Sequence, residues 1–374
     1  MKRTDIRSEI HQIVSTRKPL DIIERQHMSR IMVLVVGFML IVFSIFPHRS
    51  NGENTSLNTS SSTFAIGISQ SLDLTGNKLT FVSDEVLAQT NLEELWIDDN
   101  QITEIPEEIS RLIHLKRFSA YKNQLKMLPE SLFKLTGLER INFSVNNLSS
   151  LSECICNLKN LQVLDINHNE LIELPGAVGN LTNLRFLYLA GNHLESLPQS
   201  LENLKNLVYL NITHGKLKTL PECIGSMDSL IELRIYNNKI TAIPNCIANL
   251  QKLKEIHAMN NQIGILPDSI GCLINLRKLM LENNRLGTLP ESIGNLESLT
   301  ELDLRANKLT DLPETIGNLK SLRFLDLRDN KLTSLPPSLQ HLKNLEKIDV
   351  RLNKGLIIPE WFQELEQRGC SVFY

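Results

Sequence analysis

The chain has 374 residues, of which 42% are hydrophobic and 22% charged, the balance of a globular protein. Its net charge of −3 is nearly neutral for this length, so nothing in it favours nucleic acid, and we expect no nucleic-acid partner. No zinc-type spacing, phosphate-binding glycine loop, nucleophile elbow or paired-acid site appears, so we predict no metal, no cofactor and no enzyme.

The N-terminal region contains one strongly apolar segment, residues 31–46, which carries no charge. As a helix it would be roughly 24 Å long, a little short of a ~30 Å hydrocarbon core. Residues 1–30 before it hold seven Lys/Arg and four Asp/Glu. Positive charge stays on the cytoplasmic side, so we predict a cytoplasmic tail, a single-pass transmembrane anchor and extracytoplasmic repeats. A cleaved signal segment starting at Met28 and a soluble chain are the alternatives; no small-x-small cleavage site follows Phe46.

Residues 47–65 are rich in Ser, Thr and Asn and poor in apolar side chains. Such a segment cannot bury enough surface to offset the entropy of ordering. We therefore predict a flexible linker between the anchor and the rest of the chain.

From residue 66 onward the sequence repeats every 23 residues without insertion or deletion. The clearest column is asparagine, at positions 77, 100, 123, 146, 169, 192, 238, 261, 284, 307, 330 and 353, and Gly215 occupies the one missing position. A fixed period of this length indicates a solenoid, in which each repeat buries its apolar side against its neighbours.

One repeat, LTELDLRANKLTDLPETIGNLKS from Leu299, shows the local structure expected. Leu302 and Leu304 are two apart, which predicts a short strand with both side chains on one buried face. Leu312 and Ile316 are spaced for a helical or extended turn on the opposite side. A proline column, here Pro313, ends the inner half of the repeat because proline cannot extend the sheet.

This pattern resembles the leucine-rich-repeat family, with consensus LxxLxLxxNxLxxLPxxIxxLxx, and its proline-bearing 23-residue form is similar to bacterial and Ras-group members. The resemblance implies an α/β solenoid, a curved horseshoe of about 13 repeats over residues 66–358, with a parallel concave sheet and short helical or extended convex turns. It also implies that the asparagine side chains form a ladder of amide hydrogen bonds. Gly215 interrupts that ladder, so we expect a weak point or slight bend there. Residues 359–374, with Trp361, Phe362 and Phe373, are predicted to cap the last repeat.

The strand residues beside the buried leucines should point to the concave surface. Four of the five tyrosines and one of the two tryptophans fall in these columns. Exposed aromatic and Met side chains on a rigid sheet are typical of binding hot spots, although aromatics also simply favour strands. The candidate partner-binding residues are Trp96, Tyr121, Phe186, Tyr188, Tyr209, Arg234, Tyr236, His257, Met259 and Met280. Further along, an Asp column (303, 326, 349) runs beside an Arg column (305, 328, 351), and the two should neutralise each other.

These features predict a membrane-tethered module that binds a protein or peptide on its concave face. The alternatives are an intracellular signalling scaffold of the Ras-group type and a purely structural surface protein without a defined hot spot.

Overall fold

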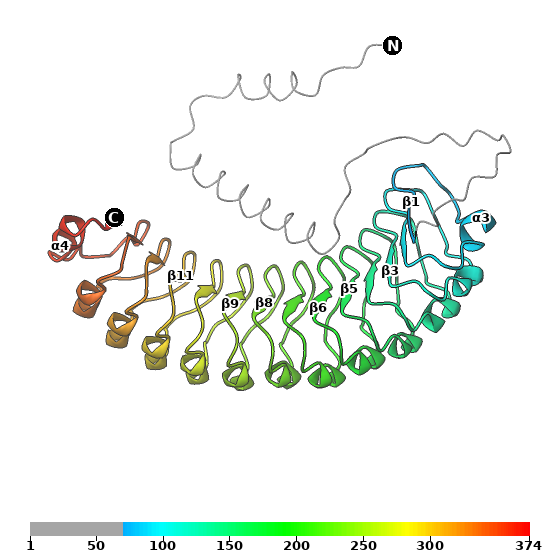
Figure 1. The fold of residues 1–374 in the computed structure, drawn as a ribbon. Helices are drawn as coiled ribbons and strands as arrows, with labels where there is room; N and C mark the ends of the chain where they lie inside the picture. The colour runs from blue at the N-terminus through cyan, green and yellow to red at the C-terminus, as the bar shows by residue number, and fades with distance from the viewer. Residues whose placement is uncertain (1–69) are drawn as a thin grey trace, which may run out of the picture. The chain divides into compact units, whose positions relative to one another are not determined.

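The computed structural model describes residues 70–374, and the anchor, tail and linker predicted for residues 1–65 lie outside this range. The described chain is a curved solenoid with one parallel sheet along its concave side (Figure 1). The strands follow sequence order: β1 Ser71–Asp73, β2 Glu94–Trp96, β3 Arg117–Ser119, β4 Arg140–Asn142, β5 Val163–Asp165, β6 Phe186–Tyr188, β7 Tyr209–Asn211, β8 Glu232–Arg234, β9 Glu255–His257, β10 Lys278–Met280, β11 Glu301–Asp303, β12 Phe324–Asp326, β13 Lys347–Asp349 and β14 Ser371–Phe373. The predicted leucine-rich-repeat horseshoe is confirmed.

Each strand has three residues, and its middle residue points inward. Leu302 is 1% exposed and Leu304, just past the strand, is fully buried, as their spacing predicts. Neighbouring strands pair so that residues 23 apart lie opposite each other, for example Leu279 and Leu302. One hydrophobic core therefore runs through all the repeats, and the flanking strand residues form straight columns on the concave face.

Short helices line the convex side (Figure 1). They are α3 Asp84–Leu87, the 3₁₀ helices η1 Glu107–Arg111, η2 Glu130–Lys134, η3 Glu153–Asn157, η4 Gly176–Asn180, η5 Gln199–Asn203, η6 Glu222–Ser226, η7 Asn245–Asn249, η8 Asp268–Cys272, η9 Glu291–Asn295, η10 Glu314–Asn318 and η11 Pro337–His341, and α4 Phe362–Gln367. The residue before each 3₁₀ helix is extended, and it is proline everywhere except at Ser152. Proline suits this position because it has no N–H to satisfy there.

The asparagine ladder is present in the structure. The Asn307 Oδ1 accepts a hydrogen bond of 3.0 Å from the Leu286 N–H, one repeat earlier. Its Nδ2 donates to the carbonyl oxygens of Leu281, at 2.9 Å, and Leu304, at 3.0 Å. The same bonds recur at each ladder asparagine from Asn100 to Asn353, so these amides satisfy the buried backbone of the turns.

The C-terminal segment extends the sheet as well as covering its end. Phe362 and Leu365 of α4 are buried against the last repeat, 2% and 1% exposed. Residues 371–373 then form β14, a fourteenth strand paired with β13. Phe373 lies opposite Asp349 and its ring is 5.1 Å from the Arg351 guanidinium, so it lies in a concave column rather than over the core, because the inward position of β14 is Val372.

Among residues 70–374 no helix is long and apolar enough to cross a membrane. The apolar segment 31–46 is not part of that range.

Candidate functional site on the concave face

The structure brings eight of the ten predicted site residues onto five adjacent strands, β6 to β10. Strand pairing places Phe186 opposite Tyr209 in one column, and Arg234 opposite His257 in the next. His257 in turn lies opposite Met280. Tyr236 and Met259 follow the ends of β8 and β9. We call these eight residues the central cluster: Phe186, Tyr188, Tyr209, Arg234, Tyr236, His257, Met259 and Met280.

Tyr188 is part of this cluster but is not exposed. Only 3% of Tyr188 is accessible, because the Tyr209 ring from the next strand packs against it, with 5.0 Å between centroids. The Arg234 guanidinium, from β8, lies 5.8 Å from the Tyr209 centroid. The expectation that Tyr188 is an exposed contact residue is therefore wrong in its premise of exposure, because its side chain is buried against Tyr209.

Burial also affects the phenol of Tyr209. Its Oη is buried and has no hydrogen-bond partner among the described residues. Removal from water raises the pKa of Tyr209, and of Tyr188, well above the usual value for tyrosine. Both side chains are neutral at physiological pH, and their rings pack against each other at a tilt of 39°, with Arg234 over the Tyr209 ring.

A small ionic network lies beside this stack. The His257 Nε2 is 2.9 Å from Glu255 Oε2 and 3.8 Å from Glu232 Oε1. Hydrogen bonding to His257 lowers the pKa of Glu255. Arg234 pairs with Glu232, and the Lys278 Nζ is 4.0 Å from Glu255 Oε1.

These groups are also the residues that could hold a metal, since ligand atoms of Glu232, Glu255 and His257 all lie within 4.8 Å of one another. However, Arg234 and Lys278 already neutralise the two carboxylates. A divalent cation would have to displace Arg234 and Lys278, and their positive charges would repel it. The arrangement is therefore better described as an ion-pair network.

The outer part of the central cluster stays accessible. Tyr236, Met259 and Met280 are each partly exposed. The Tyr236 ring is held edge-on by His214, with 5.2 Å between centroids. A partner would meet apolar side chains here, with Arg234 and Lys278 at the border, which is the composition of an interface hot spot.

Trp96 and Tyr121 lie elsewhere. Trp96 ends β2 and Tyr121 follows β3, so β4 and β5 separate them from the central cluster. The columns on β4 and β5 carry polar side chains, including Asn142 and Asp165. The predicted site is therefore divided, and its N-terminal part is a second, smaller aromatic region.

The Asp and Arg columns near the C-terminus form ion pairs, as expected. Arg328 bonds Asp326 at 2.6 Å, and Arg351 bonds Asp349 at 2.7 Å. Asp349 is fully buried and also lies 3.5 Å from Arg328. Because Arg328 and Arg351 are paired with aspartates of the protein, little free positive charge is left here for an anionic ligand. The exposed apolar residues of the central cluster make the better candidate site.

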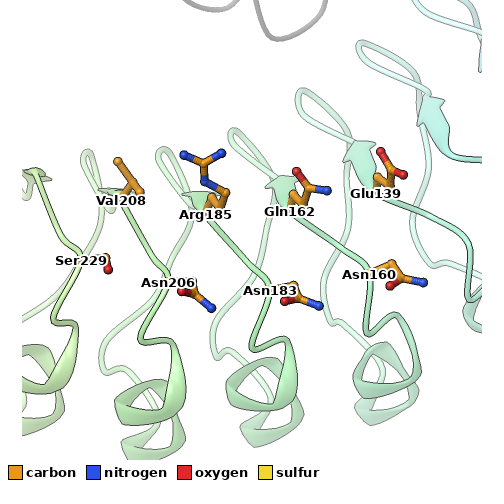
Figure 2. Close-up of a pocket in the computed structure, with 8 residues that line it drawn as sticks. All are labelled: Glu139, Asn160, Gln162, Asn183, Arg185, Asn206, Val208 and Ser229. Atoms are coloured by element: carbon orange, nitrogen blue, oxygen red, sulfur yellow. The ribbon is translucent and has the colours of Figure 1, made fainter.

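A second concave feature, on the flank of the solenoid, was not foreseen from the sequence. It is a trough of about 490 Å³ crossing four repeats, shown in Figure 2. The residues of its upper row each directly precede a strand, and those of its lower row follow 3₁₀ helices. The upper row is Glu139, Gln162, Arg185 and Val208, and the lower row is Asn160, Asn183, Asn206 and Ser229. The three asparagines donate to backbone carbonyls of the preceding repeat, at 2.8 to 3.0 Å. These amide donors therefore link neighbouring repeats and are not free to bind a ligand. For this reason the trough is a weaker candidate binding site than the concave face.

The ionic network of Glu232, Glu255 and Lys278 was also missed. The signal was available, since Glu232, Glu255 and Lys278 occupy one column of the repeat and carry charges of both signs. The sequence could not show the side-chain conformations that bring these charged groups within ion-pair distance.

Comparison with known families matches the repeat over most of the described chain. A family model described as "Leucine-rich repeat region" matches residues 176–266 and 259–367. One described as "Leucine rich repeat" matches residues 113–171 and 153–194, and another residues 91–112. A search of curated proteins gave no significant match.

Several solved structures are similar to this chain. A leucine-rich-repeat protein of Leptospira interrogans is 31% identical, with a TM-score of 0.73, and the match covers 81% of this chain and 83% of that one. The ectodomain of the Arabidopsis thaliana receptor kinase GASSHO1/SCHENGEN3, solved with Casparian strip integrity factor 2, is 30% identical, with a TM-score of 0.63, over 79% of this chain and 40% of that one. The plant peptide hormone receptor RGFR1, solved with RGF2, is 34% identical, with a TM-score of 0.62, over 75% and 51%.

Proposed function

The chain belongs to the leucine-rich-repeat family, and from this premise we propose that it is a binding protein whose concave face takes a protein or peptide partner. The observation that carries the proposal is the central cluster. Five adjacent strands place partly exposed Phe186, Tyr236, Met259 and Met280 around the packed rings of Tyr188 and Tyr209. Nothing in the packing of the repeat requires large apolar side chains at these outward positions, whereas a partner does.

Two of the similar structures support a peptide or protein as the partner. GASSHO1/SCHENGEN3 was solved with Casparian strip integrity factor 2, and RGFR1 with RGF2. Both are longer than this chain, which spans 40% and 51% of their lengths, so the likeness concerns the repeat domain only.

The predicted topology completes the proposal: residues 31–46 anchor the chain, the N-terminus is cytoplasmic and the repeats are extracytoplasmic. Its support is the uncharged apolar run and the excess of Lys/Arg before it. The chain acts in this scheme by binding and has no catalytic role.

A binding experiment tests the concave site. Peptides are selected from a displayed library against the whole protein, and their affinities are then measured for Tyr236→Ala and Met259→Ala. Met127→Ala is a matched control, because Met127 is 69% exposed and lies outside the cluster. We expect a loss of about 2 kcal/mol for each cluster variant and almost none for the control. Equal affinities for all three would refute the concave site.

A separate experiment tests the topology. Protease is added to intact cells while the membrane fraction is followed in parallel. Digestion of membrane-bound repeats from outside supports the proposal, whereas protection until lysis contradicts it and favours the intracellular Ras-group type of scaffold.

A further inference from the structure

A line of unpaired positive charge runs along the turns that follow the strands. The position directly after each ladder residue is Lys216, Lys239, Arg285, Lys308, Lys331 and Lys354 in the C-terminal half, with Gln262 as the one uncharged member. All six cations are exposed. None of them forms an ion pair within residues 70–374. We call these six residues the cationic stripe.

Backbone hydrogen bonds hold the stripe in line. At each position from Lys216 to Lys331 the N–H donates to a carbonyl oxygen of the preceding turn, for example from Lys216 to Leu194 at 3.1 Å and from Lys331 to Leu309 at 2.9 Å. Successive side chains therefore start one repeat apart, about 4.8 Å, and six steps from Lys216 to Lys354 give a line roughly 29 Å long.

The stripe is confined to one half of the molecule. Each turn is counted here as six residues, beginning one residue before the ladder position. The last seven turns, 214–219 to 352–357, hold seven Lys/Arg and two Asp/Glu. The first six, 76–81 to 191–196, hold three Lys and five Asp/Glu. Two cations in these turns do form ion pairs, Lys122 with Asp99 and Lys218 with Glu195. Both pairs lie in the first half of the repeats or next to it. The repeat itself thus does not require a cation at this position.

The spacing and width of the stripe indicate what it binds. It is one residue wide, and the position two residues further on is small and uncharged from Thr241 to Thr333: Thr241, Gly264, Gly287, Thr310 and Thr333. A membrane surface would contact a broad patch rather than a single file. An extended acidic peptide presents side chains on one face about every 6.7 Å, which does not match ~4.8 Å. Single-stranded nucleic acid needs aromatic platforms, and His214 is the one aromatic ring in the last seven turns.

We propose that the cationic stripe binds a linear acidic polysaccharide, whose sulfate or carboxylate groups repeat along the chain, while hydroxyl groups of the polymer meet the flanking threonines. This site is distinct from the concave face, because its side chains start on the turns beyond the strands. Binding by such a stripe depends on release of counterions from the polymer and therefore weakens steeply with salt.

The test measures binding of fluorescent heparin oligosaccharides by the full chain at increasing salt, with uncharged dextran as a blank. The triple variant Lys239→Gln, Lys308→Gln, Lys331→Gln is compared with Lys252→Gln, Lys320→Gln, Lys343→Gln. The control lysines are exposed, unpaired in the described chain and located on the opposite flank, so both variants lose the same charge. Circular dichroism melting checks that both remain folded.

We expect the stripe variant, which keeps three of the six cations, to lose about tenfold or more in affinity and about half of its salt dependence, and the control to lose about twofold or less in affinity. Equal loss in the two variants, or no binding of the parent chain at roughly physiological salt, overturns the proposal. Oligothymidylate or phosphatidylserine vesicles that bind as tightly through the same lysines would overturn the assignment to a polysaccharide.

Discussion

The backbone N–H of Leu194 points toward Gly215, where the corresponding amide in other repeats meets an asparagine oxygen. Leu194 is 1% exposed, and its N–H has no hydrogen-bond partner within residues 70–374. The absent Asn side chain also removes one donor from the carbonyls of Leu189 and Ile212, which keep bonds only from Asn192 and Asn238. The solenoid therefore contains one defective rung near its middle.

Three variants at this rung measure what the ladder contributes. A Cβ at Gly215 would lie 2.7 Å from Asn238 Oδ1, so any side chain costs stability there. Gly215→Asn and Gly215→Ala share this cost, but only Asn supplies both the acceptor and the donor. We expect Gly215→Asn to unfold with a free energy about 1–3 kcal/mol above that of Gly215→Ala in urea titrations, with Gly215→Asp between them. No difference between Asn and Ala would show that the ladder contributes little at this rung.

The same rung should open more readily than its neighbours. Hydrogen exchange of the amides around Leu194 is expected to be faster than at Leu217 or Leu171, whose N–H groups bond Asn238 and Asn192. Equal protection at the three sites would contradict a weak point.

Asp165 should make stability depend on pH. Burial raises its pKa to about 7, from an ordinary value of 3.8. The folded chain thus holds this proton more tightly than the unfolded chain does, and the free energy of unfolding falls as pH rises from about 4 to about 7. Asp165→Asn removes the effect, and Asn is tolerated in this column at Asn142 and Asn211, whose Oδ1 atoms accept the same type of backbone bond.

We expect Asp165→Asn to be more stable than the parent by on the order of 2 kcal/mol at pH 8 and equal to it near pH 4. Chemical denaturation at the two pH values measures this. Asp73→Asn is the control, because Asp73 occupies the same column on β1 but is exposed. A gain for Asp165→Asn that is the same at both pH values would rule out ionisation as its cause.

Val145 is held in a left-handed backbone conformation, with φ of 56°. The residue before each ladder position has positive φ, and Gly, Asn and Asp fill seven of these thirteen positions. A β-branched side chain is the least suited to this region. Val145→Asn should raise the free energy of unfolding by about 1 kcal/mol, measured by thermal and urea denaturation. Ala306→Val, at φ of 53°, should lower it, and stabilisation by both variants would exclude backbone strain as the reason.

Tyr209 carries a hydroxyl that the fold does not use. Its Oη is buried without a partner in the described chain, while its ring packs on Tyr188. Tyr209→Phe keeps the ring and removes the unsatisfied group, so we expect a gain of about 0.5–1 kcal/mol in the free energy of unfolding. Tyr209→Ala should instead lose about 3 kcal/mol, because Tyr188 is then uncovered. A destabilised Tyr209→Phe would reveal a hydrogen bond made through solvent.

The sequence alone determined the repeat, the buried strand leucines, the proline column and the asparagine column, and the family resemblance implied that the asparagines form a hydrogen-bonded ladder. These features are local and recur at each turn, because every repeat must present the same apolar side and the same backbone needs to its neighbour. Even the defect at Gly215 was readable, since one absent side chain removes the same bonds wherever it occurs.

Only the tertiary structure decided how side chains from neighbouring strands pack against one another. Tyr188 and Tyr209 are 21 residues apart, and it is the choice of side-chain direction that buries the first and leaves the second partly exposed. The raised pKa of Asp165 has the same origin, since it depends on what covers the carboxylate. Likewise, Ser371–Phe373 became a fourteenth strand because the edge of β13 offered unpaired backbone groups. Periodicity specifies which residues share a column, whereas packing across the columns specifies which of them a partner can reach.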